Sequence, residues 1–224
     1  IDPLEQIDED SFPKGLNITK ECNEALKMLK GNREERIQGL RIFCEYRDSR
    51  SFPLLLPLLD QPCPVERMSA VYALGRNPCP SAVQKLVSLL KTDDNAYVRR
   101  ATAWSLANYD NQIVLEPLIN ALKNDVAAVR LWSSSSLAEI GNVSLENAQL
   151  AAEQLLISLK IDNESGVRSN CIWSLCRLYE KLNNTFQESF VDECTKIALF
   201  DKEPSVMEEA KTALDSMGMQ GFYN

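Results

Sequence analysis

Cysteine has the most reactive side chain that this sequence offers, because the chain contains seven cysteines and no histidine. The lack of histidine removes histidine-based triads, the commonest general base and the commonest metal ligand. No CxxC pair and no glycine-rich phosphate-binding loop is present, and Cys171 and Cys176, five residues apart on a predicted helix, do not share a face. We therefore predict no catalytic residue, no metal site and no cofactor.

Two Cys-Pro pairs, Cys63-Pro64 and Cys79-Pro80, fall at predicted helix starts in successive loops. Their simplest interpretation is as ordinary loop residues, and the alternative is that the thiols bind haem or a thiol-seeking pigment. The odd number of cysteines, without paired spacing, indicates free thiols and favours a reducing cytoplasm.

Arginine and aspartate recur together at a regular interval. An aspartate precedes each of four predicted helices and an arginine lies in the first turn of the same helix, which suggests a structural ladder of charge-assisted hydrogen bonds. The alternative interpretation of the arginines is a positively charged groove. The pairs are Asp60/Arg67, Asp93/Arg99, Asp125/Arg130 and Asp162/Arg168.

These arginines belong to a longer internal repeat. A leucine follows seven residues after each one, at Leu74, Leu106, Leu137 and Leu175, and a fifth copy carries Met207 and Leu214. The step between copies is 32, 31, 38 and 39 residues, and such a period marks a stacked repeat array. Upstream of each copy, apolar residues spaced i, i+3, i+4, i+7 predict another amphipathic helix, as in Leu115/Leu118/Ile119/Leu122.

The sequence thus predicts an all-α, right-handed α-solenoid of about five to six two-helix repeats. We expect an acidic extended arm at residues 1–17, a capping helical pair at 18–50, five repeats at 51–217 and a tail at 218–224. The repeats lengthen by about seven residues after Gly141, which we assign to longer loops around 142–146 and 182–187. Pro57 should bend or shorten its helix.

Aromatic residues occupy the second helix of the repeats outside the positions that pack inward. Tyr72, Trp104 and Trp173 each lie five residues after the repeated arginine, and Trp132 lies two residues after Arg130. All three tryptophans of the chain are therefore in this set. Tryptophan, tyrosine and arginine dominate binding hot spots, although tryptophans could instead fill gaps between neighbouring helices. The predicted partner-binding residues are Tyr72, Arg76, Arg100, Trp104, Asn108, Trp132, Glu139, Trp173 and Arg177.

The formal net charge of −8 disfavours nonspecific binding to nucleic acid or to an anionic membrane. No apolar run reaches the ~20 residues that a transmembrane helix needs. We therefore expect a protein partner and a cytoplasmic location, without nucleic acid and without a membrane span.

Val-Arg followed seven residues later by leucine, at Val98-Arg99, Val129-Arg130 and Val167-Arg168, resembles the HEAT-like repeats of the phycobilisome lyase class, also called E/Z-type HEAT repeats. This resemblance implies that the second helices line the concave side of the solenoid. It also implies a family whose members attach or detach bilin pigments on phycobiliproteins, or only scaffold, with one branch that partners iron–sulfur carriers.

Three functional hypotheses follow. The first is a noncatalytic scaffold or adaptor that grips a protein partner along the second helices. The second is a bilin lyase subunit or bilin-handling chaperone, in which Arg76, Arg100 or Arg177 would meet bilin propionates on or near a phycobiliprotein. The third is a partner of iron–sulfur assembly carriers that would use exposed thiols of Cys63 and Cys79.

Overall fold

A computed structural model describes residues 18–219 of the chain, and within this range every regular element is helical. The predicted acidic arm at 1–17, and the predicted tail from residue 220 onward, lie outside the described residues. Short 3-10 turns lead into or follow several of the helices. The α-helices are α1 (Ile18–Met28), α2 (Arg33–Glu45), α3 (Phe52–Leu55), α4 (Pro64–Arg76), α5 (Val83–Thr92), α6 (Ala96–Leu106), α7 (Leu115–Asn124), α8 (Ala127–Gly141), α9 (Leu145–Ile161), α10 (Ser165–Leu178), α11 (Asn184–Phe200) and α12 (Pro204–Ser216).

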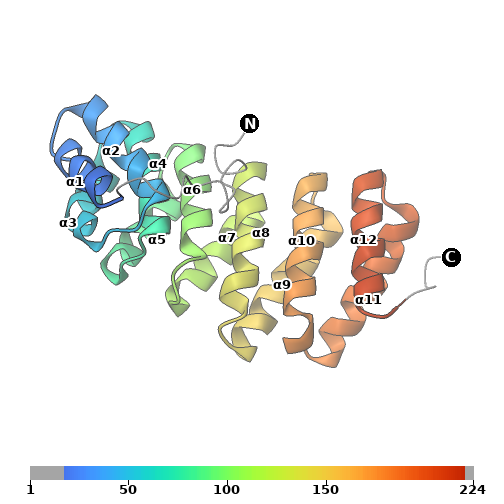
Figure 1. The fold of residues 1–224 in the computed structure, drawn as a ribbon. Helices are drawn as coiled ribbons and strands as arrows, with labels where there is room; N and C mark the ends of the chain where they lie inside the picture. The colour runs from blue at the N-terminus through green and yellow to red at the C-terminus, as the bar shows by residue number, and fades with distance from the viewer. Residues whose placement is uncertain (1–17, 220–224) are drawn as a thin grey trace.

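The helices form two rows, with the even-numbered helices in one and the odd-numbered helices in the other (Figure 1). Each even helix packs on the odd helix before it and on the next even helix, so the core is continuous from end to end. The repeated leucines at Leu74, Leu106, Leu137, Leu175 and Leu214 are fully buried in it. This confirms the predicted all-helical solenoid.

The even helices contact one another more extensively than the odd helices do. Small side chains make the close approach possible. Ser136 of α8 donates from its hydroxyl to the carbonyl oxygen of Ala103 at 2.8 Å, and Ser174 of α10 donates to the carbonyl oxygen of Ser134 at 2.8 Å. Both serines are buried, and their hydrogen bonds join neighbouring helices of the row.

Helix boundaries follow local chemistry. Asn32 caps α2 in a reciprocal capping box with Glu35, while Asn95, Ser144 and Asn183 each accept an amide hydrogen bond at the start of their helices. Proline cannot donate a backbone hydrogen bond inside a helix, and the predicted effect of Pro57 is confirmed: α3 ends at Leu55 and continues as a 3-10 segment, Leu56–Asp60.

The prediction that the later repeats lengthen in their loops is wrong. Helices α5 and α7 have 10 residues each, whereas α9 and α11 have 17, so the seven additional residues extend the helices by about two turns. The connection before α9 is short, with Ser144 already capping the helix. Because a helix satisfies its own backbone hydrogen bonds, adding whole turns keeps the apolar stripe in register.

The charged ladder exists, but its pairing differs from the one expected within a repeat. Each arginine binds the aspartate of the next repeat through two hydrogen bonds, and its third nitrogen donates to backbone carbonyls of its own turn. Asp93, the aspartate in the same repeat as Arg99, is bound by Arg67 of the preceding repeat. The bridges are Arg67–Asp93, Arg99–Asp125, Arg130–Asp162 and Arg168–Asp201, with shortest N–O distances of 2.7 Å.

Asp60 is not part of this ladder. It lies exposed and pairs with Lys85, while the corresponding role at the N-terminal end belongs to Glu66, which binds Arg36 of the capping pair. At the other end Met207 replaces the arginine, and Asp201 is occupied by Arg168. The bridges therefore tie each repeat to the next one rather than closing its own turn.

The bridges make stability sensitive to acid. Burial raises the pKa of Asp93, Asp162 and Asp201, but hydrogen bonds from the bridging arginine and a turn amide outweigh it and hold each pKa below the ordinary 3.8. A carboxylate with a depressed folded pKa stabilises the fold above its unfolded pKa, and this contribution is lost as pH falls through the folded value.

We therefore expect the urea midpoint, followed by circular dichroism, to hold between pH 7 and 5 and to fall steeply below about pH 4. Asp201→Asn should flatten this acid limb because the mutated bridge no longer titrates. A midpoint that stays level down to pH 3 would contradict the assignment.

No helix within residues 18–219 combines the length and the apolar character needed to cross a membrane.

Candidate partner-binding face

The side of the even-numbered helices that faces away from the odd-numbered row is here called the even face. It carries all nine residues that the sequence singled out for partner binding. They come from α4, α6, α8 and α10, except Asn108, which lies two residues past the end of α6. The first group is centred on Tyr72 and Trp104, whose rings meet edge to face with centroids 5.5 Å apart. Arg100 donates from Nη2 to the Tyr72 hydroxyl at 3.2 Å, and its guanidinium lies 5.8 Å from the centre of the exposed Tyr97 ring.

Glycine at position 75 allows Trp104 to lie against α4. A Cβ atom at Gly75 would stand 2.4 Å from Cζ3 of Trp104 and 3.1 Å from the Ser105 hydroxyl. The indole is therefore half-buried, with one edge in the seam between α4 and α6. Both interpretations of the sequence apply to Trp104, because it fills a gap and still presents part of its ring to solvent.

Gly75→Ala should push the Trp104 ring out of its seam and destabilise the fold by about 1–3 kcal/mol, as overpacking of a closed site does. The control is Gly166→Ala in α10, where the nearest atom to a new Cβ is the flexible Cδ1 of Leu131 at 3.2 Å. Urea denaturation measures both changes, and a shifted Trp104 fluorescence maximum should accompany only the first. Equal unfolding free energies for the two variants would contradict the tight contact.

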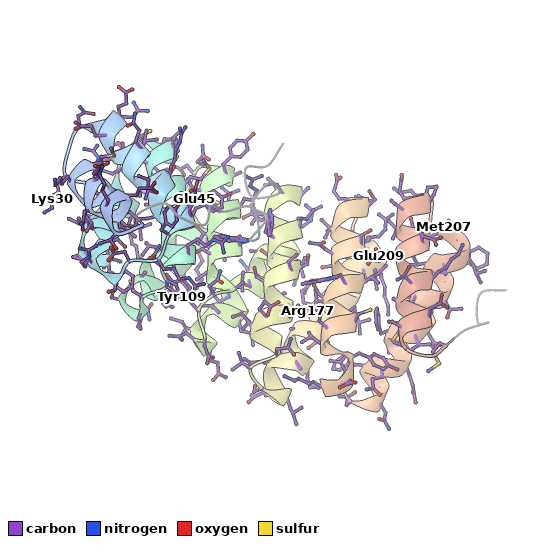
Figure 2. The ribbon with its side chains drawn as sticks, viewed as in Figure 1. Lys30, Glu45, Tyr109, Arg177, Met207 and Glu209 are labelled. Atoms are coloured by element: carbon purple, nitrogen blue, oxygen red, sulfur yellow. The ribbon has the colours of Figure 1, made fainter. Side chains whose placement is uncertain are left out.

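The second group surrounds Trp173, whose residue is 39% exposed. The Arg177 guanidinium stacks over its ring at 4.9 Å and also forms a 2.8 Å ion pair with Glu139 of α8. Figure 2 shows Arg177 on α10 and Glu209 on α12 along the same row of helices. Beside Trp173 lies a hollow of about 300 Å³, and Ser135, Ser169, Asn170 and Glu209 complete its lining.

Asn170 is a residue of this hollow that the sequence pattern did not indicate. Its amide nitrogen donates to the carbonyl oxygen of Leu131 at 3.0 Å and to the Ser135 hydroxyl at 2.5 Å. These bonds leave the amide oxygen of Asn170 to accept from a ligand at the edge of the hollow. Only the position two residues after the repeated arginine, shared with Trp132, could have pointed to it.

The remaining predicted residues lie on the same face in different settings. Trp132 is half-buried against the core, which fits a gap-filling role better than an exposed anchor. Arg76 occupies the last turn of α4, and Asn108 lies exposed beyond α6, where its amide is 3.5 Å from the carbonyl oxygen of Ser105. The predicted residues therefore form two separate aromatic–arginine groups, one on α4 and α6 and one on α8 and α10.

The expectation that Cys63 and Cys79 are both exposed is wrong for Cys79. Cys79 is buried, with its sulfur 3.5 Å from the Ser81 hydroxyl. Cys63 is half-exposed at the start of α4, where the amide of Glu66 lowers the pKa of its thiol and Arg33 donates to its sulfur at 3.0 Å. All seven cysteines are free thiols, and among residues 18–219 no cluster of three metal-ligating side chains occurs.

Two buried polar residues that sequence reasoning missed fix the N-terminal repeats. The Asn77 side chain donates to the carbonyl oxygens of Phe43, Tyr46 and Ala73, and it accepts from the amide of Asp48 at 2.7 Å. Tyr109 donates from its hydroxyl to the carbonyl oxygen of Leu74 at 3.0 Å, and its burial raises its pKa. Both join neighbouring repeats and are structural.

A protein-family model described as HEAT repeats matches residues 23–107 and 83–176. No curated protein matches the chain at a significant level. Among solved structures, an engineered protein is similar over 88% of this chain and 98% of its own, with 20% identity and a TM-score of 0.64. A designed armadillo repeat protein in complex with the peptide (KR)4 covers 96% of each chain at 20% identity and a TM-score of 0.57.

Kap95, in a complex with Nup1, is similar at 15% identity and a TM-score of 0.63, with 96% of this chain but 32% of Kap95 covered. Identities this low show that the fold is shared. They do not transfer a ligand or an activity.

Proposed function

Because the chain belongs to the HEAT-repeat family, we propose that it is a noncatalytic protein-binding scaffold whose partner lies along the even face. The observation that carries this proposal is the pair of aromatic–arginine groups on that face, Tyr72/Trp104 with Arg100 and Trp173 with Arg177. Large aromatic rings beside guanidinium groups are the residue types that dominate binding hot spots.

The geometry supports a long partner rather than a small molecule. Four successive even helices carry the groups, and adjacent helix axes are ~8–10 Å apart, so the contact surface extends over roughly 30 Å. The hollow beside Trp173 can hold one side chain, with Glu209 and the amide of Asn170 as polar contacts. The structurally similar designed armadillo repeat protein holds a peptide, and Kap95 occurs in a complex with a protein, which agrees with a binding role for a repeat surface.

The phycobilisome lyase resemblance supplies the more specific alternative, in which the same arginines meet bilin propionates. No feature of the described residues is particular to a bilin. The iron–sulfur alternative is weakened because it required two accessible thiols and Cys79 is buried. The scaffold therefore remains the function that the even face supports best.

The experiment that tests the proposal is an affinity pull-down from native extract with mass spectrometry, comparing wild type with Trp104→Ala/Trp173→Ala. A protein that is retained by wild type and lost from the variant would support binding on the even face. Phycobiliproteins lost in this way would favour the bilin alternative, which transfer of bilin to an apo-phycobiliprotein would then test. Identical partner lists would overturn the proposal, provided that circular dichroism shows both proteins to be folded.

A further inference from the structure

A second surface of the molecule combines exposed apolar side chains with positive charge, and it does not belong to the even face. It is a groove of about 410 Å³ between α9 and α11, beside the Arg168–Asp201 bridge, here called the late groove. Phe200 and Ile161 form its walls and are 81% and 72% exposed, which makes them the most exposed large apolar side chains in the described part of the chain.

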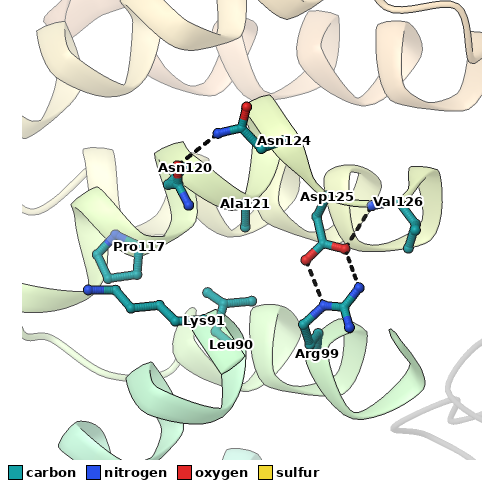
Figure 3. A pocket seen from close by; sticks show the side chains of 9 residues that line it. All are labelled: Leu90, Lys91, Arg99, Pro117, Asn120, Ala121, Asn124, Asp125 and Val126. Atoms are coloured by element: carbon teal, nitrogen blue, oxygen red, sulfur yellow. Dashed lines mark hydrogen bonds and ion pairs between the residues drawn. The ribbon is translucent and has the colours of Figure 1, made fainter. Parts of the chain in front are cut away.

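The fold contains a matched groove for comparison. The early groove, also about 410 Å³, lies between α5 and α7 beside the Arg99–Asp125 bridge (Figure 3). Since both grooves occupy the same place relative to their bridge, their residues correspond one to one when counted from Asp125 and Asp201. The two sites therefore show what the repeat architecture requires and what the late groove adds.

Four of the differences add an apolar side chain or a positive charge to the late groove, whereas Glu193, in place of Pro117, adds one negative charge. Phe200 corresponds to Asn124, since each directly precedes the aspartate of its bridge. Ile161 directly precedes Asp162 as Thr92 directly precedes Asp93, so these two residues correspond as well. Lys196 and Lys202 correspond to Asn120 and Val126. The early groove shows that the bridge and the turn form with polar residues at these positions, so the fold does not require the exposed phenylalanine and isoleucine.

The charge of the late groove is opposite to that of the whole chain. Lys160, Lys196 and Lys202 line it, and Glu193, 3.5 Å from Lys196, is the one carboxylate there outside the ladder. Asp162 and Asp201 are neutralised by Arg130 and Arg168. The groove thus carries an excess of positive charge on a protein with a net charge of −8.

We propose that the late groove is a second docking site, which binds an acidic peptide segment of a partner with an aromatic or aliphatic side chain inserted between Ile161 and Phe200. Exposed apolar side chains surrounded by charge mark interaction sites, and opposite charge selects the partner. The carboxylates of the segment meet the three lysines, while its apolar side chain covers the two walls. This site lies on the edge where each odd helix turns into its even helix, so a partner on the even face can be bound at the same time.

The test uses the full chain and a short fluorescent peptide in which Phe and Leu alternate with Asp and Glu, followed by anisotropy at low salt. We expect saturable binding that added salt weakens, and no binding of a peptide with Lys in place of its acids. Phe200→Asn and Lys196→Asn, which install the residues of the early groove, should each lower the affinity by about tenfold or more. Trp104→Ala/Trp173→Ala should bind the peptide like wild type.

The reverse substitutions make the test independent of any folding defect. In the Phe200→Asn chain, Asn124→Phe with Asn120→Lys rebuilds the apolar wall and the charge in the early groove, and peptide binding should return. Equal binding by wild type and Phe200→Asn, or no binding of the acidic peptide by wild type, would overturn the proposal. Concentration-dependent dimerisation abolished by Phe200→Asn would also overturn it, because the occupant would then be a second copy of this chain.

Discussion

Arg168→Met should lower the free energy of unfolding by about 3–5 kcal/mol, the largest effect that we expect from a single charged residue in this chain. The Arg168 and Asp201 side chains are only 6% and 9% exposed, and two hydrogen bonds of 3.0 and 2.7 Å join them. Arg168 also donates to the carbonyl oxygens of Asp162 and Asn163. Methionine keeps an unbranched apolar stem but lacks the guanidinium, which leaves Asp201 as a buried charge without its bridge.

Urea denaturation followed by circular dichroism measures this effect, and Lys85→Met serves as the control. Lys85 pairs with Asp60 on the surface, where an ion pair contributes about 0–1 kcal/mol, so its loss should hardly move the midpoint. The double change Arg168→Met/Asp201→Leu should recover much of the lost stability, because it removes the stranded carboxylate. A loss below about 1 kcal/mol for Arg168→Met would show that the bridge contributes no more than a surface pair.

Trp104→Ala and Trp173→Ala should each weaken the binding of a protein partner on the even face by about 2 kcal/mol or more, a roughly 30-fold rise in Kd. Both rings reach the surface, and each lies beside an arginine, Arg100 or Arg177, that can hold a carboxylate of the partner. Isothermal titration calorimetry measures the change. Since Trp104 and Trp173 lie on α6 and α10, with α8 between them, their effects should be close to additive.

Trp132→Ala provides the matched control on α8. Its ring packs against the core, so its removal should lower the free energy of unfolding while changing Kd by less than about threefold. The interpretation of the even face fails if Trp132→Ala and Trp173→Ala shift Kd to the same extent while both proteins stay folded.

Local patterns in the sequence were sufficient to predict the repeat, the helix pairs and the bend at Pro57. These features depend on apolar spacing and backbone chemistry that a single helix already contains. The pairing of the bridges depends instead on how one repeat lies on the next. Arg67 bonds Asp93, 26 residues away, and nothing in the first turn of its helix distinguishes that carboxylate from the nearer Asp60.

Two other differences have the same physical origin. The seven added residues after Gly141 looked like loop because polar residues such as Asn142 and Glu146 flank them, yet Ser144 caps a longer α9 there. Cys79 looked exposed because the Cys79-Pro80 pair falls in a predicted loop, yet Cys79 is buried. The even-face residues were placed by register alone, whereas the seam at Gly75 and the late groove became apparent only when neighbouring helices were seen together.

The bridge to the next repeat has a consequence for how such a chain can change its length. Asp93 and Asp125 are 32 residues apart (125 − 93), each at the end of an odd helix and each accepting the arginine of the preceding repeat. Excising residues 93–124 would splice α5 directly to Asp125, and Arg67 would then meet Asp125 in place of Asp93. Each repeat thus offers the same arginine and the same aspartate to its neighbours, so that a whole repeat can be removed or duplicated without losing a bridge. In the fifth repeat Met207 stands at the position of the arginine, so this repeat has no guanidinium there to bind an aspartate.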